Sequence, residues 1–405
     1  MKKSIVCIAF YIPGTGLTRV MDALVQQFRD EYMVHYVGVG YKGPRIEQPG
    51  LTIYPTNLEG GDVMGSYIAR ELIEAIEPEC VFILQDVWHF QRYMMVFDGL
   101  RDKTKIVGYT PIDGEVTNPE SVSYLLGLDT LVLYTEWARD QVRNALLEIA
   151  PEEKLPRMEV VAHGVDTKQF YHLEDRQAVR KEVFPGLEEG AFVVLNASRP
   201  CVRKRVDLTL RAFAAFAEDK PAKVKLCLHQ AIREEQSLQL LDLIKELDIE
   251  GRVVLNPFSG RRESEVLSDE DLNKLYNACD VGVNSSMGEG WGLVSFEHAA
   301  TGAAQIVPDH TACAELWKDS GIVVETEPSE IGQISPFVMT QPTLESLQAA
   351  FELLYSNFSE RERLAERCYQ NAQREAYTWE AIAKQWESVF QAAVRLPNNQ
   401  PVLVG

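Results

Sequence analysis

The sequence predicts an α/β protein with two doubly wound parallel sheets in tandem. Short apolar runs alternate with longer amphipathic stretches, which is typical of parallel strands covered by helices. This alternation runs through the first half of the chain and begins again in the second half. A chain of 405 residues, 46% of them hydrophobic, is long enough for two domains of ordinary size.

The apolar runs have the length and composition of buried strands. In the first half we expect strands at residues 4–10, 34–39, 80–84, 105–109, 130–134 and 159–162. In the second half we expect strands at residues 192–196, 223–228, 253–255, 281–284, 304–307 and 322–324. Amphipathic stretches between them predict helices, for example at 20–28, 62–75, 138–147, 206–216, 234–247, 268–277 and 344–355.

The domain boundary is expected just after residues 163–170, because the charged segment 174–183 has little strand character. His163 stands at this boundary, where we expect it to order the linker by hydrogen bonding rather than to act in catalysis. The expected parts are a first domain of residues 1–170, a second of residues 171–375, and a C-terminal helical segment of residues 376–405.

Charge excludes some classes of partner. The formal net charge is −20, whereas proteins that hold nucleic acid need clustered Lys and Arg for the phosphate backbone. The same charge disfavours broad adsorption to an anionic membrane and leaves peripheral membrane contact at most. We therefore expect no nucleic-acid partner.

The cysteines and the N-terminus indicate a cytoplasmic protein. The cysteines are odd in number, scattered and without zinc-ligand spacing, as reduced core residues would be; they are residues 7, 80, 201, 227, 279, 313 and 368. The first apolar run is interrupted at residues 11–16, so we interpret it as a strand rather than a signal sequence. No apolar run approaches the roughly 18 residues needed to span a membrane.

The stretch 285–297 carries the most specific pattern in the chain. It joins an expected strand to a stretch of helical character through Gly288, Gly290 and Gly292. Backbone N–H groups at such a junction lack internal partners, which makes phosphate a natural ligand. Glu289 and Glu297 flank the turn eight residues apart. Taken alone, they are equally well explained as ordinary helix-start carboxylates that favour the helix dipole.

A basic loop follows the strand at 192–196 and precedes a helix. It contains Arg199, Arg203, Lys204 and Arg205, in a chain that is acidic overall. Such a cluster can neutralise a phosphate group. For at least one of Arg203 and Arg205, a solvated loop charge is the better interpretation.

Together, these two stretches resemble the retaining glycosyltransferases of family 4, the group 1 glycosyltransferases. Glu289 through Glu297 is similar to the family's E-x7-E motif, and Gly-Trp-Gly-Leu lies between the glutamates. Arg199 and Lys204 match the family's Gly-Arg-x4-Lys pattern, with Ser198 in place of the glycine. The resemblance implies the GT-B fold, in which two Rossmann-like domains face a cleft and a C-terminal helix crosses back to the first domain. It extends over residues 191–324, and over most of residues 1–150 it is topological only.

The resemblance also implies a reaction and roles for single residues. A hexose would pass from a GDP- or UDP-linked sugar to an acceptor hydroxyl with retention of anomeric configuration, and no metal or other cofactor is expected. Glu289 would lie by the transferred sugar and Glu297 by the ribose. Arg199 and Lys204 would stabilise the departing diphosphate. The main chain would contribute at the donor-binding residues Gly290, Trp291, Gly292, Leu293 and Phe258.

Two loops of the first domain supply further candidates. Gly14, Thr15 and Gly16 follow the first strand, where glycines let a substrate approach the backbone. A third glycine or small residue is missing at Arg19, so the full dinucleotide fingerprint is absent and an NAD enzyme is disfavoured. In the family this loop meets the acceptor or the diphosphate.

Asp113 occupies the region where many members of the family carry a histidine. It follows the strand at 105–109, and there it either orients a sugar hydroxyl or takes a proton from the acceptor. An ordinary Asp-Gly turn explains it equally well. His89 is a weaker candidate.

Another acidic pattern is set aside. Residues 269–271 have the Asp-x-Asp form of metal-dependent glycosyltransferases, but they follow Ser268 at an expected helix start, which favours capping.

Other functions remain open. One is a catalytically inert sugar-nucleotide or glycan-binding protein, suggested by the missing histidine; another is an epimerase or phosphorylase of the same fold. The acceptor is unknown: a glycan, a lipid and a small metabolite are all compatible with the sequence.

Overall fold

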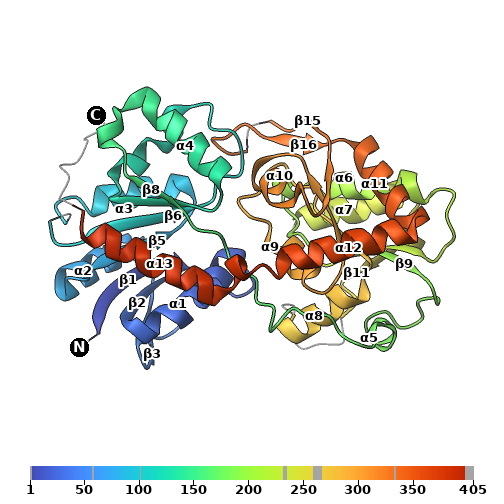
Figure 1. Cartoon of the computed structure of the whole chain (residues 1–405), viewed down its shortest axis with the longest axis horizontal. Helices are drawn as coiled ribbons and strands as arrows, with labels where there is room; N and C mark the ends of the chain where they lie inside the picture. The colour runs from blue at the N-terminus through green and yellow to red at the C-terminus, as the bar shows by residue number, and fades with distance from the viewer. Residues whose placement is uncertain are drawn as a thin grey trace. The chain divides into compact units, whose positions relative to one another are not determined.

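The computed structural model describes residues 2–396 apart from 57–58, 101, 231–234, 259–266 and 333. Its internal contacts divide the chain into two compact units, which Figure 1 shows with their elements labelled. Unit 1 contains residues 1–164, the short segment Pro336–Val338 and the chain from Ala376 onward. Unit 2 contains residues 165–335 and 339–375.

Unit 1 is built on an eight-stranded sheet in the order β3-β4-β2-β1-β5-β6-β7-β8. Its strands pair in parallel except for β3 with β4. The direction in which successive strands are added reverses between β1 and β5. The strands are β1 (Lys3–Phe10), β2 (Tyr32–Val39), β3 (Ile46–Gln48), β4 (Leu51–Pro55), β5 (Cys80–Leu84), β6 (Lys105–Thr110), β7 (Thr130–Leu133) and β8 (Arg157–Val160).

Helices cover the sheet of unit 1. They are α1 (Gly16–Glu31), α2 (Ser66–Ile76), α3 (Phe90–Val96), α4 (Glu136–Ile149) and α13 (Trp379–Val394), with short 3-10 turns η1 (Val87–His89), η2 (Pro119–Gly127) and η3 (Glu152–Lys154). The C-terminal helix α13 is part of this unit because its aromatic side chains enter the core beneath the sheet. Trp386 lies 4.6 Å from Phe82 of β5, and Phe390 lies 5.2 Å from Phe28 of α1 between ring centroids.

Unit 2 is built on a six-stranded, wholly parallel sheet in the order β11-β10-β9-β12-β13-β14. Here the reversal falls between β9 and β12. A separate antiparallel pair, β15 with β16, completes the strands. The strands are β9 (Phe192–Asn196), β10 (Val224–Leu228), β11 (Val253–Leu255), β12 (Val281–Val283), β13 (Ala304–Pro308), β14 (Ile322–Val324), β15 (Thr326–Pro328) and β16 (Thr340–Pro342).

The helices of unit 2 alternate with its strands, as Figure 1 shows in green through orange. They are α5 (Arg176–Val183), α6 (Val206–Ala217), α7 (Glu235–Glu246), α8 (Asp269–Ala278), α9 (Leu293–Ala299), α10 (Thr311–Trp317), α11 (Leu344–Ser356) and α12 (Phe358–Ala372), with 3-10 turns η4 (Val202–Lys204), η5 (Glu250–Arg252) and, after α12, η6 (Glu375–Tyr377). The charged segment 174–183 is mostly helix α5: Arg176 and Arg180 donate hydrogen bonds to backbone carbonyls at the end of α8.

The predicted fold class is confirmed. The expected strands correspond to those of the two main sheets, with ends that differ by one or two residues. The short strands β3 and β4 were missed, as was the β15–β16 pair. A three-residue edge strand such as β3 buries too little apolar surface to show a pattern, since its residues are exposed or half-buried.

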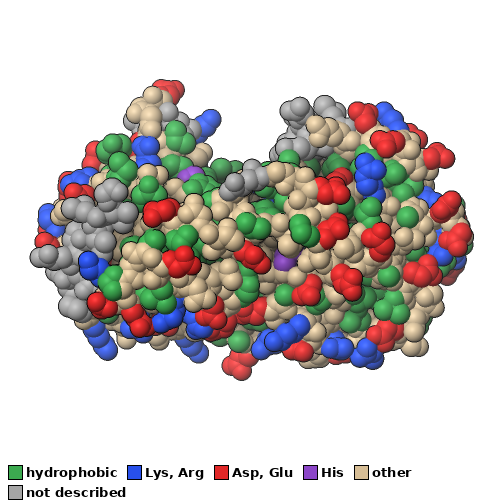
Figure 2. Space-filling model, turned by 90° about the horizontal axis from the view of Figure 1, so that it is seen from above, with side chains coloured by type: hydrophobic (Ala, Val, Ile, Leu, Met, Phe, Trp, Pro, Cys, Tyr) green, Lys and Arg blue, Asp and Glu red, His purple; other side chains and the backbone are tan. Residues whose placement is uncertain are grey.

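The surface reflects the acidic composition. In the face drawn in Figure 2, Asp and Glu side chains are spread widely, with Lys and Arg interspersed among them. In the part of the chain that the structure describes, no helix has the length and hydropathy required to cross a membrane.

Candidate functional site

The carboxyl ends of β9 and β12 form the reversal point of the sheet in unit 2. In open α/β sheets, ligands bind at such a point because the loops on either side diverge and leave backbone and side chains accessible. The loop after β9 contains η4 with its basic residues, and the loop after β12 contains Glu289. The fold therefore brings together the two stretches that the sequence singled out.

The basic loop is held in one conformation by Arg205. This residue has φ 43°, in the left-handed region, and only 5% of its surface is exposed. Its guanidinium contacts Asp207 at 2.9 Å and also donates to the side-chain oxygen of Gln341. Arg205 is thus a structural residue, and the expectation of a solvated loop charge does not describe it.

Ser285 joins the two loops. Its hydroxyl lies 3.0 Å from the carbonyl oxygen of Lys204 and 2.9 Å from that of Arg205. Thr209 of α6 lies 2.8 Å from the same hydroxyl. The backbone N–H of Met287 donates to the carbonyl of Arg203 at 2.8 Å. These bonds fix the β9 and β12 loops relative to one another.

Glu289 forms the electrostatic centre of this site. Its carboxylate is 6% exposed and accepts a short hydrogen bond from Lys204 Nζ, while Arg203 lies 3.5 Å away. Asn284 Nδ2 donates to the same carboxylate at 3.2 Å. Burial raises the pKa of Glu289, but the two cations and the hydrogen bonds from Lys204 and Asn284 outweigh it, and the pKa falls to about 2. Glu289 is therefore ionised at neutral pH.

The backbone of Glu289 is also held. Its N–H donates to Thr311 Oγ1 at 3.2 Å, and its carbonyl accepts from the N–H of Ala312 at 3.3 Å. Thr311 has φ 48°, a conformation that a β-branched residue adopts only when its surroundings enforce it. His310 Nε2 lies 2.8 Å from the carbonyl of Ser286. Hydrogen bonds from the start of α10 thus hold the loop after β12 in place.

Glu297 lies on α9, which begins after Gly292. This glycine has φ 92°, so the left-handed turn that starts the helix favours a residue without a side chain. Glu297 is 6% exposed, and Tyr276 of α8 donates a 2.9 Å hydrogen bond to its carboxylate. Trp291 is buried with its ring stacked on Phe296 at 5.1 Å.

Arg199 differs from the other cations of the site. It is exposed and has no hydrogen-bond or ion-pair partner among the residues that the structure describes. Its guanidinium is therefore available to an anion from solvent.

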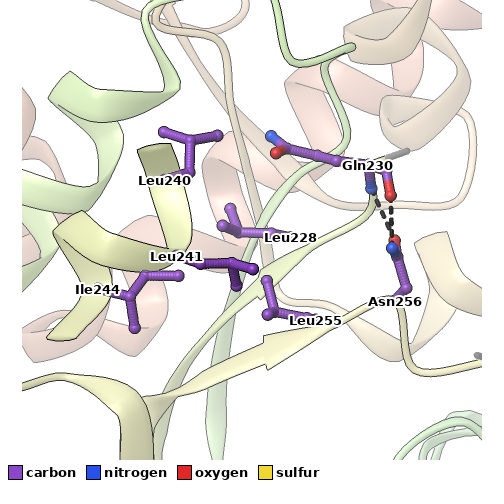
Figure 3. A pocket seen from close by; sticks show the side chains of 7 residues that line it. All are labelled: Leu228, Gln230, Leu240, Leu241, Ile244, Leu255 and Asn256. Atoms are coloured by element: carbon purple, nitrogen blue, oxygen red, sulfur yellow. Dashed lines mark hydrogen bonds between the residues drawn. The ribbon is translucent and has the colours of Figure 1, made fainter. Parts of the chain in front are cut away.

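Phe258 is buried at 3% exposure, beyond β11. Before it, Asn256 joins the ends of β10 and β11 through reciprocal hydrogen bonds with the backbone of Gln230, one of which measures 2.7 Å. Figure 3 shows this pair at the rim of a small cavity of about 20 Å³, lined by Leu228, Gln230, Leu240, Leu241, Ile244, Leu255 and Asn256. A cavity of this size has room for about one water molecule and not for a nucleotide.

The remaining candidates belong to unit 1. Gly14 has φ 82°, and Thr15 is the N-cap residue of α1, with its hydroxyl 2.8 Å from that of Thr18. Gly16 is the first residue of that helix. Asp113 is half-buried after β6. All four residues lie at the carboxyl edge of one sheet, whereas the residues around Glu289 lie in unit 2.

Two expectations about structural residues are confirmed. His163 is buried, Tyr109 lies 2.7 Å from its Nδ1, and burial lowers its pKa to about 3, so it is a neutral structural histidine. Ser268 caps α8 by accepting from the N–H of Asp271 at 3.1 Å, which explains the acidic residues at 269–271. His89 is half-buried, and desolvation lowers its pKa.

Sequence reasoning assigned no role to Asn284 and Ser285 and only a minor one to Thr311, although these residues support Glu289 and its loop. Asn284, Ser285 and Thr311 are small polar residues, and each stands just after a buried strand or at a helix start. Polar residues at the carboxyl end of an apolar run are the one pattern that could have indicated them. Arg203 was expected to be uncertain; it contacts both Glu289 and the carbonyl of Gly288.

Comparisons with known proteins agree with this architecture. Residues 191–334 match the family model "Glycosyl transferases group 1". The chain is 26% identical to mannosylfructose-phosphate synthase of Agrobacterium fabrum over 251 residues, 60% of this chain and 50% of that protein. It is also 26% identical to D-inositol 3-phosphate glycosyltransferase of Corynebacterium urealyticum over 255 residues, 60% of this chain and 53% of that protein. The matches thus span about half the length of these curated relatives.

Solved structures show the same fold. Sucrose-phosphate synthase of Thermosynechococcus elongatus superimposes with a TM-score of 0.75 at 15% identity and covers 96% of this chain and 99% of that chain. HepE of Anabaena, solved in complex with UDP and glucose, gives a TM-score of 0.69 at 15% identity over 96% of this chain and all of that chain. Two parallel-sheet units with this topology define a GT-B protein. Residues 191–334 are thus similar to the group 1 glycosyltransferases, within a chain that has the GT-B fold.

Proposed function

We propose that this protein transfers a hexose from a nucleotide-diphosphate sugar, GDP- or UDP-linked, to an acceptor hydroxyl with retention of anomeric configuration. The observation that carries the proposal is the buried Glu289 carboxylate, held against Lys204 and Arg203 at the reversal point of the unit 2 sheet. The match of residues 191–334 to the group 1 glycosyltransferase model suggests the reaction class, and this cluster supplies groups of both charges for a sugar and a diphosphate.

In this proposal each charged group has a separate task. Lys204 and Arg199 stabilise the negative charge that develops on the departing diphosphate. Glu289 accepts hydrogen bonds from hydroxyl groups of the sugar, and Glu297 accepts them from the ribose. Main-chain groups of residues 290–293 and Phe258 complete the donor site, to which we also assign Gly14, Thr15 and Gly16, whose loop meets the diphosphate or the acceptor. Asp113 orients a sugar hydroxyl or takes the proton of the acceptor.

Retention follows if the acceptor attacks on the face that the diphosphate leaves. The acceptor oxygen forms the new bond to the anomeric carbon as the bond from that carbon to the diphosphate oxygen breaks. The same diphosphate oxygen then takes the proton of the acceptor hydroxyl. No side-chain nucleophile is required. Since Arg199, Lys204 and Arg203 already supply positive charge, we propose that transfer proceeds without a metal ion.

The acceptor is proposed only by class: a glycan, a lipid or a small metabolite. The names of two relatives, mannosylfructose-phosphate synthase and sucrose-phosphate synthase, make hexose phosphates sensible first compounds to test. We further propose a cytoplasmic protein whose contact with membranes is peripheral at most.

Thermal-shift binding tests the donor site. Purified protein is heated with UDP, GDP, ADP and their common sugar conjugates, once with EDTA and once with magnesium. Stabilisation by one nucleotide in EDTA identifies the donor, because a ligand that binds the folded state raises its unfolding temperature. Transfer assays with that donor follow. Binding without transfer or donor hydrolysis would favour the inert binding protein, and no response to any nucleotide would overturn the donor site.

A further inference from the structure

Glu289 and the cations beside it neutralise one another's charge. Lys204 Nζ bonds to Glu289, the side chain of Lys204 is only 17% exposed, and Arg203 is 26% exposed. Under the proposed function, the same lysine must turn to the diphosphate and the same carboxylate must turn to the sugar. When the donor binds, Lys204 and Glu289 therefore give up their contact with each other and contact the diphosphate and the sugar instead. This change takes place in a cluster that is largely shielded from water.

A sugar nucleotide and a bare nucleoside diphosphate differ in the hydrogen-bond donors that they offer to Glu289. Either ligand draws Lys204 toward phosphate oxygens and away from Glu289. The sugar then offers hydroxyl donors to the carboxylate, whereas the bare diphosphate offers none. After Lys204 and Arg203 turn away, Asn284 Nδ2 is the side-chain donor that remains on the Glu289 carboxylate among the described residues. A buried carboxylate with too few partners is unfavourable.

The carboxylate has little freedom to escape into solvent. Its own N–H and C=O are bonded to Thr311 and Ala312 of α10, and the neighbouring loop is joined to the β9 loop through Ser285. Arg199, by contrast, is exposed, so it can meet a diphosphate of either kind without breaking an ion pair. Discrimination between the sugar nucleotide and the bare diphosphate thus depends on Glu289 and not on the whole basic loop.

From this arrangement we infer that Glu289 is a specificity-determining residue that makes the site favour the sugar-bearing donor over the sugar-free nucleoside diphosphate. The inference rests on the proposed function and extends it, because it assigns to Glu289 the release of the product nucleotide. When the hexose has left, the ion pair between Lys204 and Glu289 forms again, and Lys204 releases the diphosphate.

Calorimetric titration with two ligand pairs, UDP with UDP-glucose and GDP with GDP-mannose, tests this inference. The proteins are the wild type, Glu289→Gln and the control Glu362→Gln, which removes a carboxylate from an exposed position of α12. For the pair that binds, we expect Glu289→Gln to bind the bare diphosphate at least about tenfold more tightly than the wild type. The affinity for the sugar nucleotide should gain less or fall, and the control should match the wild type.

Each outcome decides a different question. An unchanged ratio of the two dissociation constants in Glu289→Gln, within about twofold, overturns the inference but leaves the proposed function intact. Absence of binding to the wild type for both pairs overturns the proposed function itself. If Glu289→Gln does not fold, wild-type protein is titrated with the diphosphate in the presence and absence of free glucose or mannose. The free hexose should then strengthen diphosphate binding several-fold, and no effect would overturn the inference.

Discussion

The carboxyl edges of the two sheets have the same topology and very different chemistry. In unit 2 the loops at the reversal point carry a buried ion pair, Lys204 with Glu289. In unit 1 the corresponding loops follow β1 and β5, and their polar groups are mostly neutral. Thr18 donates to the carbonyl of Phe10 at 2.9 Å, and both polar atoms of the fully buried Gln85 amide have no partner among the described residues.

This difference shows that the fold sets the position of the loops, whereas their side chains set the charge that a ligand meets. The reversal of strand order places diverging loops at one point in each sheet, whatever their sequence. Charge at that point then decides which ligand is favoured. The loops of unit 2 offer a buried ion pair to a ligand, whereas the loops after β1 and β5 of unit 1 offer mainly hydroxyl and amide groups. Four changes test this contrast, from the largest expected effect to the smallest.

Lys204→Ala should have the largest effect. Loss of a charge-stabilising donor typically lowers kcat by about 10²- to 10³-fold. The change also leaves Glu289 buried without its closest cation, which costs about 3–5 kcal/mol of unfolding free energy. We therefore expect slow turnover together with a melting temperature lower by several degrees. In the double variant with Glu289→Gln, stability should recover while turnover stays low; recovery of both would assign a purely structural role to Lys204.

Arg199→Ala should separate catalysis from stability. Because Arg199 is exposed and unpaired among described residues, its loss breaks no contact within the fold. We expect kcat/KM to fall roughly 10- to 100-fold, as for the loss of a charged contact worth about 1.5–3 kcal/mol. The melting temperature without ligand should stay within about one degree of the wild type. Arg211→Ala in α6 serves as the control, and equal turnover in the two variants would contradict the assignment.

Glu297→Gln should weaken nucleotide binding about tenfold, since a charged hydrogen bond to the ribose becomes a neutral one. Titration with the nucleotide found by thermal shift measures the change. Tyr276→Phe is the matched control, because it removes the 2.9 Å donor to Glu297 but keeps the carboxylate charge. A variant Glu297→Gln with wild-type affinity would show that this carboxylate only supports α9.

The smallest effect concerns acid stability and compares one histidine from each unit. Burial lowers the pKa of both His163 in unit 1 and His298 in unit 2 to about 3. Between pH 6.5 and 3 the unfolded chain binds protons that the folded units do not, so stability falls as the pH falls. Each histidine contributes roughly 1.4 kcal/mol per pH unit in that window.

His163→Gln should make the unfolding of unit 1 less sensitive to acid and leave unit 2 unchanged. Scanning calorimetry at pH 7 and pH 5 follows the two transitions. His298→Gln is the reciprocal control and should affect unit 2 alone. If His163→Gln leaves the pH dependence as it is in the wild type, then protonation of His163 is not what limits acid stability.

The sequence was most informative where a short pattern of residues corresponds directly to a strand or to the start of a helix. The periodicity of buried strands predicted both main sheets, and Ser268 with the acids after it predicted the start of α8. The spacing of Glu289 and Glu297 predicted a site in the loop after β12, and that site stays a prediction. Short strands such as β3 left no pattern, because a half-exposed edge strand has no apolar face to display.

Sequence alone therefore determined the fold class, the position of the two loops at the reversal point of unit 2 and the types of residue within them, since these depend on local pattern and spacing. Only the tertiary structure decided which partner each basic residue contacts and which of them stays exposed. Arg205 turns inward to Asp207 and Gln341, Lys204 turns to Glu289, and Arg199 stays exposed. These residues lie within seven positions of one another, and nothing local distinguishes them. Glu289 and Gln341 lie far along the chain from Lys204 and Arg205, so only folding brings these groups within reach.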